Sequence, residues 1–379
     1  DVWSHYYSYI RRVNTYLESS EKFEVNLDAY KLDPSENAQE IYKTRLADIT
    51  NWKKEARFLR AYYHFELIKR YGGIPIMTTA LSLDTDFEKI QRNSLQECVD
   101  FVVNECTVLG GEGPNGEEDA LPIVYNNDNL GRVTRGAALA LKSRLLLYAA
   151  SDLWNTESWA QGYSHPELIV LNKKDRKERW AEAAAAAKAV IDLSAQAGYE
   201  LMSRYTDLGK VYQSPELILV RRINGNTNTF EKLNFPAGFP NGEGRVTPSQ
   251  NLVDAYEMTD GSKFDWNNPE HAANPYANRD PRLALTVYMN GASFQNTTIE
   301  TFEGGAHKNI KNGTLTGYYL RKFVDSNINL VTNGTSNHPW VIFRISEIYL
   351  NYAEALNESD PGNPDILIYA NKARERSDV

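Results

Sequence analysis

The sequence has few of the features that mark a membrane-spanning, nucleic-acid-binding or redox protein. Its 379 residues include only two cysteines. It has no apolar run near the ~20 residues that a membrane-spanning helix requires. Acidic residues outnumber basic ones, which gives a net charge of -9, and lysine and arginine form no block or stripe. We therefore expect no spanning helix and no nucleic-acid partner.

The two cysteines do not predict a disulfide. Cys98 and Cys106 lie eight residues apart on one helical pattern, together with Leu95, Val99 and Val102. A helix rises by about 12 Å over that distance, which is too far for a disulfide bond. Both cysteines are therefore predicted to be core thiols.

Motifs for catalysis and metal binding are also missing. The sequence contains no G-x-S-x-G, no H-E-x-x-H, no P-loop and no G-x-G-x-x-G after a strand. His64 is best interpreted as a core histidine. Residues 84–86 and 260–265 are acidic but lack the alternating oxygen ligands of a calcium loop. We predict no cofactor and no metal site, and a structural calcium ion in an acidic loop stays open.

Paired carboxylates for glycoside hydrolysis are defined by their separation in space, so sequence alone does not test for them. Glu347 and Glu354 lie seven residues apart on one face of a predicted helix. In so apolar a helix we expect them to bind neighbouring backbone or arginine groups. No catalytic residue is predicted.

The clearest structural signal is a helix over residues 55–71, within EARFLRAYYHFELIKRYGGIPIM. Phe58, Ala61 and Phe65 begin one apolar row at helical spacing, and a second row runs beside it. Such a helix packs on two sides. Gly72 and the following Gly-Ile-Pro end it.

Other helices are predicted on both sides of this one. They cover residues 1–18, the cysteine-bearing stretch after Ser94, residues 135–151 and 180–193, and residues 340–358, with a last helix after Pro364. Residues 19–36 are polar and aperiodic, and they are predicted to form a surface loop. Small residues recur in the helices without a fixed 34-residue period. The predicted fold class is mostly α, with tetratricopeptide-like helix pairs forming a scaffold.

The helical pattern fades between residues 198 and 339, where Gly, Asn, Thr, Pro and aromatic residues dominate. We interpret this part as a long loop-rich insertion containing short strands, predicted at residues 217–221, 283–288 and 318–322. Residues 1–197 and 340–379 form the helical scaffold, and 198–339 form the ligand-facing part of a single domain over 1–379.

Six segments, in order, resemble motifs of the SusD/RagB family. The central helix with Y-G-G-I-P is one, and W-x-x-x-Y-x-x-I-x-x-x-N at the start is similar to an early family helix. The others are the small-residue helix ending near Ser151 with its short Leu-Trp-Asn corner, TPSQNLVDAYEMTDG, YANRDPRLALTV and RISEIYLNYAEA. The resemblance also implies further family segments before and after this chain.

The resemblance implies a non-enzymatic protein that binds oligo- or polysaccharide and delivers it to a SusC-like TonB-dependent transporter. It implies a place on the outer face of the outer membrane, with the membrane contacted only through an N-terminal lipid. The same family resemblance leaves a peptide-binding, RagB-like function open. A helical glycoside hydrolase and a plain tetratricopeptide scaffold are the remaining alternatives, and the glycan itself is not identified.

The binding residues are predicted from placement alone, because the shared motifs carry none. A sugar ring needs a flat aromatic platform with amide, carboxylate or guanidinium groups beside it. Aromatic residues in loops meet that description, although they also serve to pin loops to a scaffold. The candidate ligand-binding residues are Tyr30, Phe230, Phe235, Phe239, Asn241, Arg245, Trp266 and Asn267.

Overall fold

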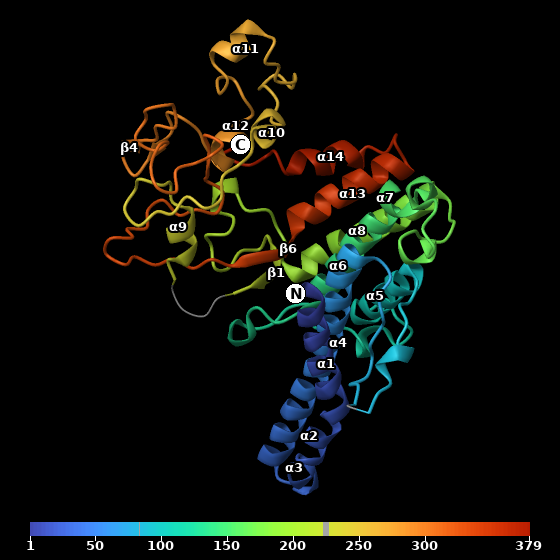
Figure 1. Cartoon of the computed structure of the whole chain (residues 1–379). Coiled ribbons are helices and arrows are strands. Elements are labelled where there is room, and N and C mark those ends of the chain that lie inside the picture. Colours follow the sequence, from blue (N-terminus) through green and yellow to red (C-terminus); the bar gives the residue numbers. More distant parts are fainter. Residues whose placement is uncertain (83, 223–226) are drawn as a thin grey trace. The chain divides into compact units, whose positions relative to one another are not determined.

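The computed structural model describes residues 1–82, 84–222 and 227–379. It divides into two compact units. Unit 1 consists of residues 1–200, 216–219 and 342–373, and unit 2 of residues 201–215, 220–341 and 374–379. Long helices form unit 1, whereas loops, short helices and short strands form unit 2 (Figure 1). The fold is mostly α, as predicted.

Unit 1 contains ten α-helices among its described residues, and six of them exceed 14 residues. They are α1 (Val2–Ser19), α2 (Glu21–Val25), α3 (Asp28–Leu32), α4 (Glu36–Tyr71), α5 (Leu95–Leu109), α6 (Arg135–Ala150), α7 (Asp152–Asn155), α8 (Arg176–Ala197), α13 (Ile345–Ser359) and α14 (Asp365–Lys372). Short 3-10 helices lie at Phe87–Lys89, Gly116–Glu118, Asn127–Asn129, Glu157–Ala160, Pro166–Leu168 and, in unit 2, Tyr205–Asp207.

The central helix is longer than predicted. α4 begins at Glu36, where the Ser35 side chain accepts a hydrogen bond from the backbone N–H of Ala38. Phe58, Ala61 and Phe65 are completely buried. The helix ends at Gly72, whose φ of 72° lies in the left-handed region and whose N–H donates to the Ile68 carbonyl over 2.8 Å.

The predicted loop over residues 19–36 is wrong. This stretch forms α2 and α3, and α1 and α3 both contact α4. The Gln39 side chain donates to the backbone carbonyls of Tyr30 (3.1 Å), Lys31 (3.2 Å) and Asp33 (2.6 Å). Side-chain bonds of this kind stabilise short, exposed helices that no apolar periodicity reveals.

The helices of unit 1 pack largely in chain order. α4 contacts α5, α5 contacts α6, α6 contacts α8, α8 contacts α13, and α13 contacts α14. Ala137, Ala138, Ala183 and Ala187 are buried on α6 and α8, where small side chains allow helices to approach closely. These contacts are the tetratricopeptide-like helix pairs that the sequence predicted.

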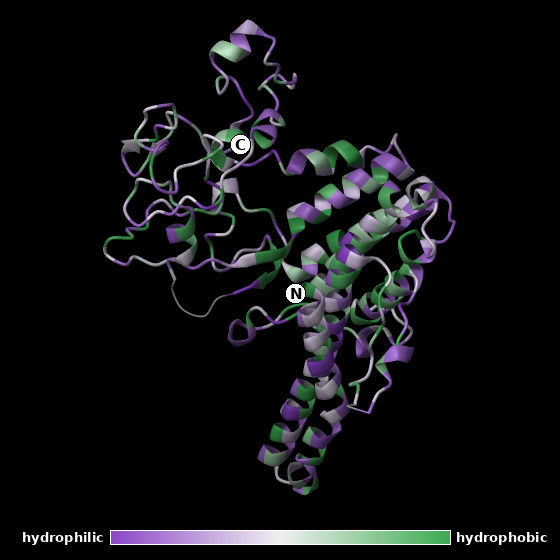
Figure 2. Ribbon diagram, in the orientation of Figure 1, coloured by the Kyte–Doolittle hydropathy of each residue, from purple (hydrophilic) through white to green (hydrophobic). Residues whose placement is uncertain are grey.

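No helix in the described ranges is long and apolar enough to cross a membrane. Hydrophilic residues recur along α1 and α4 (Figure 2).

Cys98 and Cys106 are buried free thiols on α5, which confirms their interpretation as core residues. The Ser94 capping box with Glu97, at the start of α5, is also present.

The returning helix begins later than predicted. Residues 340–344 form strand β6 (Trp340–Arg344), which pairs with β1 (Leu217–Arg221), and α13 starts only at Ile345. Val341, Ile342 and Phe343 favour a strand because β-branched and aromatic side chains pack well on a pleated surface. The predicted strand at residues 217–221 is confirmed.

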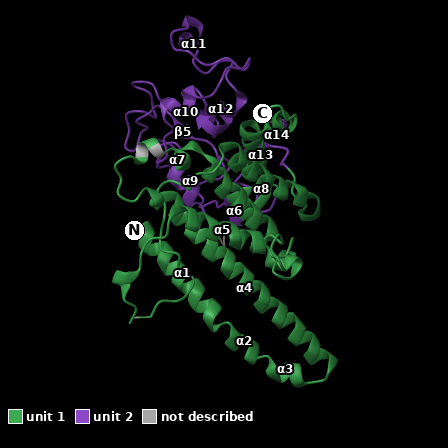
Figure 3. Cartoon of the chain, turned by 90° about the vertical axis from the view of Figure 1, so that its right-hand side faces the viewer, with its two compact units in different colours: residues 1–200, 216–219, 342–373 green, residues 201–215, 220–341, 374–379 purple. Residues whose placement is uncertain are grey.

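Unit 2 contains α9 to α12 (Figure 3) and two short antiparallel strand pairs. The helices are α9 (Thr229–Asn234), α10 (Gln250–Asp254), α11 (Pro269–Ala273) and α12 (Pro281–Thr286). Strand β2 (Val287–Tyr288) pairs antiparallel with β5 (Tyr319–Leu320), and β3 (Ser293–Phe294) pairs antiparallel with β4 (Thr297–Thr298).

The strand predicted at residues 283–288 is mostly wrong. Pro281 takes the first position of α12, and the Asp280 carboxylate accepts a hydrogen bond from the Arg282 backbone N–H over 2.9 Å. Proline at this position and an aspartate cap favour a helix start. Only residues 287–288 are strand, and of the predicted strand at 318–322 only residues 319–320 are.

Candidate functional site

Three cavities in the described structure differ in their lining. A groove of about 650 Å³ in unit 1 is largely apolar, with Trp3, Tyr7, Ile10 and Phe87 in its walls. Unit 2 contains a cavity of about 670 Å³ within residues 258–278 and a cleft of about 360 Å³. A hydroxyl-rich ligand needs hydrogen-bond partners, so the two polar cavities of unit 2 suit it better than the groove does.

The first of these polar cavities lies within a loop that we call the Trp266 loop, residues 254–279. Its base is closed by two backbone bonds, from Thr259 N–H to the Asn278 carbonyl and from Met258 N–H to the Ser262 carbonyl, each 2.8 Å long. Ser249 caps the start of α10, and the helix ends at Asp254, where the loop begins. Asn268 caps α11 inside the loop.

Trp266 is the exposed aromatic residue of this loop. Its side chain is 48% exposed, and its indole Nε1–H donates to both carboxylate oxygens of Asp254 over 3.2 Å. The Phe264 ring lies edge-on to the indole, with 4.9 Å between the ring centroids. One edge of the indole is therefore fixed while much of the ring stays accessible.

Arg279 holds the base of the loop together. Its guanidinium donates to the backbone carbonyls of Pro275, Val253 and Tyr256, and it lies 4.1 Å from the centroid of the Phe264 ring. Arg279 is 6% exposed, and burial lowers its pKa. Because these bonds tie the loop to the end of α10, the arginine positions Phe264 and, through it, Trp266.

Polar groups surround the aromatic pair. Asn267 is exposed, and its backbone N–H and side-chain amide both donate to the Asp265 carboxylate, over 2.8 and 2.9 Å. His271 stacks on Phe264 with 5.4 Å between centroids and lines the cavity together with Asp260 and Glu270. An aromatic face, amide groups and carboxylates are thus present on one loop.

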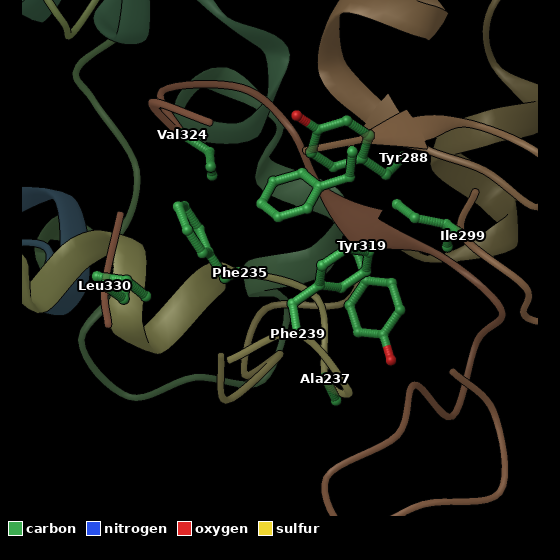
Figure 4. Close-up of a cluster of buried hydrophobic side chains, with 9 residues drawn as sticks. Phe235, Ala237, Phe239, Tyr288, Ile299, Tyr319, Val324 and Leu330 are labelled. Carbon is green, nitrogen blue, oxygen red and sulfur yellow. The ribbon is translucent and has the colours of Figure 1, made fainter. Parts of the chain in front are cut away.

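The other predicted residues of unit 2 do not form such a site. Phe235 and Phe239 are 1% and 8% exposed, in a core cluster around Tyr319 (Figure 4), so their rings offer no face to a ligand. Phe230 is partly buried against the same cluster and packs on His338. We therefore leave all three out of the candidate site.

Asn241, Arg245 and Tyr30 are exposed but stand apart from an aromatic platform. The Asn241 amide donates to the Leu330 carbonyl over 3.2 Å, and Arg245 forms an ion pair with Glu243 over 2.6 Å. Tyr30 lies on α3 of unit 1 and is 41% exposed. Of the eight predicted residues, Trp266 and Asn267 lie together on the loop that forms the polar cavity, whose walls come from other residues of that loop.

Sequence reasoning missed Asp254 and His271. Asp254 precedes Trp266 by twelve residues within a segment that resembles a family motif, and no spacing rule connects a carboxylate to a distant indole. His271 follows Trp266 by five residues in α11. Its proximity to a tryptophan and two asparagines was the only available signal.

No group of three or more His, Cys, Asp or Glu side chains that could hold a metal ion occurs within residues 1–82, 84–222 and 227–379. Both carboxylate oxygens of Glu347 accept hydrogen bonds from Arg144 over 2.6 Å. That contact agrees with the arginine partner predicted for it.

His64 is buried, with Nδ1 2.7 Å from the Arg60 carbonyl and Nε2 accepting from the Met77 N–H, as expected of a core histidine.

The helix pairs of unit 1 and the loop-rich unit 2 define a tetratricopeptide-like protein with a large insertion. Family models identify it further. A model of the SusD family matches residues 215–379, and a model described as starch-binding associating with outer membrane matches residues 1–147. The chain belongs to the SusD family.

Solved structures share this fold. A SusD-like protein from Bacteroides fragilis is 23% identical with a TM-score of 0.72, and the match covers all of this chain and 68% of that one. A SusD-like carbohydrate-binding protein from the same organism is 21% identical with a TM-score of 0.72, covering all of this chain and 65% of that one. A laminarin-binding SusD-like protein is 19% identical, with a TM-score of 0.55 and coverage of 98% and 69%. Comparison with curated proteins finds no match.

Proposed function

We propose that this chain binds an oligo- or polysaccharide without chemical reaction, and that Trp266 is the platform for a sugar ring. The carrying observation is the half-exposed indole, fixed by Asp254 and Phe264 on the same loop that encloses a polar cavity of about 670 Å³. The apolar C–H face of a sugar stacks on such a ring while its hydroxyls bind the polar groups around it. Asn267, the next residue along the chain, and His271, which stacks on Phe264, are candidates for those groups.

The relatives support carbohydrate as the ligand. Two of the similar structures are described as a carbohydrate-binding protein and a laminarin-binding protein. Following the family, the bound glycan is passed to a SusC-like TonB-dependent transporter in the outer membrane. The helices of unit 1 pack on that partner, and an N-terminal lipid holds the protein on the outer face.

The test is affinity electrophoresis and calorimetry of the purified chain against plant, host and microbial polysaccharides. For a glycan that is retained, Trp266→Ala is expected to weaken binding at least about tenfold, which is typical of a central tryptophan in a binding site. Trp52→Ala is the matched control, because Trp52 is 41% exposed on α4 in unit 1. It is expected to bind like the unchanged chain.

Three results would overturn the proposal. Retention by no glycan would remove carbohydrate as the ligand, and peptide affinity in its place would indicate the RagB-like alternative. Equal loss of binding in both tryptophan variants would remove Trp266 from the site. Release of reducing ends by the purified chain would show an enzyme instead.

A further inference from the structure

The second polar cavity of unit 2, a cleft of about 360 Å³, has a different composition from the Trp266 loop. Its walls come from residues 204–210 and 321–327, with Leu285, Tyr288 and Asp378 completing them. We call it the basic cleft. It carries four cationic side chains, those of Arg204, Lys210, Arg321 and Lys322, and three carboxylates, those of Asp207, Asp325 and Asp378.

One wall of the basic cleft is held in an unusual backbone conformation. The backbone N–H groups of Arg321 and Lys322 both donate to the Thr286 carbonyl over 3.0 Å. Phe323 follows with a φ of 68°, which is a rare conformation for a bulky residue. Its ring lies against Gly209, where an added Cβ would be only 2.4 Å from the ring. The wall is thus fixed by backbone bonds and by close packing.

The opposite wall is fixed by Asp378. Its carboxylate accepts hydrogen bonds from the backbone N–H groups of Tyr205 (2.6 Å) and Thr206 (3.0 Å) and from the Thr206 hydroxyl (2.6 Å). Burial raises the pKa of Asp378, but these bonds outweigh burial and hold the pKa below its ordinary value. The negative charge of Asp378 is therefore committed to the wall.

Two of the cations already have oxygen partners. Arg321 donates to the Ala284 carbonyl over 2.9 Å, and Arg204 lies 3.8 Å from the Asp378 carboxylate. The two lysines differ from them. Lys322 lies over the rings of Tyr205 and Phe323, with its Nζ 5.0 and 5.4 Å from their centroids.

Neither lysine ammonium has a hydrogen-bonded or ion-paired oxygen within the described part of the chain. Burial lowers the pKa of Lys210, and the nearby charges of Asp325 and Asp207 act in the opposite direction. The Asp325 carboxylate accepts a hydrogen bond from the Asn327 N–H over 3.1 Å. Among the described residues, the Asp207 carboxylate accepts no such bond. Burying an ammonium without a partner is unfavourable, and an incoming anion relieves that cost.

We propose that the basic cleft binds a uronic acid residue, and hence that the glycan bound by this chain is an acidic polysaccharide. A uronate combines a carboxylate, which fits Lys210 and Lys322, with a sugar ring whose C–H face fits Tyr205 and Phe323. A neutral sugar would leave both ammonium groups without an oxygen partner of opposite charge. A volume of about 360 Å³ is at the lower end of the ~300–1,000 Å³ usual for ligand sites, which suits a short segment of glycan.

The inference rests on the proposed function and is tested by calorimetry at pH 7 and low salt. The probes are galacturonate oligomers and neutral galactose oligomers of the same length, with inorganic phosphate as the simple anion. We expect the unchanged chain to prefer the uronate over the neutral oligomer by at least about tenfold. Lys210→Met and Lys322→Met are each expected to remove most of that preference.

Matched variants separate charge in the cleft from charge elsewhere. Lys232→Met removes an exposed lysine on α9 that lies outside the cleft, and it is expected to leave the preference unchanged. Asp207→Asn removes the unbonded carboxylate and is expected to strengthen uronate binding. Circular dichroism and thermal unfolding of each variant establish that it is folded.

Three outcomes would overturn the inference. They are uronate binding that is unchanged in both lysine variants, equal affinity for uronate and neutral oligomers, and displacement of the uronate by phosphate at equal concentration. Failure of the proposed function is distinct, because it appears as retention of no glycan, or as glycan binding that Trp266→Ala weakens no more than Trp52→Ala does. Loss in Trp266→Ala with no effect of the lysine variants would retain the proposed function and remove the basic cleft from it.

Discussion

The buried pair of Glu231 and His338 in unit 2 makes a quantitative prediction. Glu231 is fully buried, and its carboxylate lies 2.5 Å from His338 Nε2. His338 Nδ1 lies 2.9 Å from the Gly209 carbonyl, so both ring nitrogens face acceptors. Only a protonated imidazolium donates to both.

The pKa shifts agree with a charged pair. Burial lowers the pKa of His338, but the hydrogen bond and charge of Glu231 outweigh it and raise the pKa above 6.5. Burial raises the pKa of Glu231, but the hydrogen bond and charge of His338 outweigh it and hold the pKa below 4.5. The charge of Asp325 also raises the pKa of His338.

Replacing His338 by leucine would leave the carboxylate buried without its cation. Removing one partner of a buried pair costs about 3–5 kcal/mol. Glu231 would keep the hydroxyl of Ser336, at 2.9 Å, and the N–H of Asp325, at 3.3 Å. We therefore expect the lower end, about 3 kcal/mol, at pH 6. The double variant Glu231→Gln with His338→Leu is expected to recover at least about 1 kcal/mol, because no unpaired charge remains.

The cost depends on pH with a definite sign. The raised pKa of His338 means that its contribution is complete below pH 6.5 and is lost as the pH rises through the folded-state value. The lowered pKa of Glu231 means that its contribution is complete above pH 4.5 and is lost as the pH falls through the folded-state value. The stabilisation by the pair is therefore greatest between about pH 4.5 and 6.5.

The assay is urea unfolding of the unchanged chain, the single variants and the double variant at pH 6 and pH 9. The free energy of unfolding lost in His338→Leu should be clearly smaller at pH 9 than at pH 6. A loss below about 1 kcal/mol at pH 6 would contradict a buried ion pair. So would equal losses at the two pH values.

Other predictions concern unfolding free energies measured in the same way. Gly72→Ala should cost more than about 2 kcal/mol, because φ is 72° and the new Cβ would lie 2.2 Å from the Leu168 carbonyl oxygen. Gly198→Ala should cost only about 1 kcal/mol, because φ is similar, at 70°, but the space is open; equal costs would refute the steric argument. Ser94→Ala should cost about 1 kcal/mol through loss of the capping box on α5, and no measurable loss would show that the cap is dispensable. Asp378→Ala should cost about 2 kcal/mol through its three hydrogen bonds, and a loss as small as that of an exposed side chain would contradict their role.

Structural features that depend on residues close together within one helix could be predicted from the sequence. The apolar rows through Phe58 and Phe65, the cap at Ser94 and the stop at Gly72 all act within a few residues, so their physical causes are local. The extension of α4 back to Glu36 was not readable, because its outer turns are polar and exposed. Strand β6 was hidden for a different reason, since its pairing partner β1 is far away in the sequence.

The candidate site shows the same division. An aromatic residue in a loop can be a core residue or an exposed one, and composition does not separate the two. Phe235 and Phe239 join strand β5 and a hairpin in one core, a long-range association that no local pattern encodes. Trp266 lies between an aspartate and an edge-on phenylalanine instead. Only the fold reveals which aromatic faces remain accessible.

The pairing of β1 with β6 has a consequence for how this chain is made and how it can change. Neighbouring strands lie about 4.8 Å apart, so the chain leaves the helices and returns to them at almost the same place. The residues between β1 and β6 therefore form an insertion whose two ends lie close together. Its length and sequence can change while α8 and α13 keep their contact. During synthesis, however, α8 is made long before α13. The packing of α8 against α13 can therefore form only after all residues between β1 and β6 have been translated.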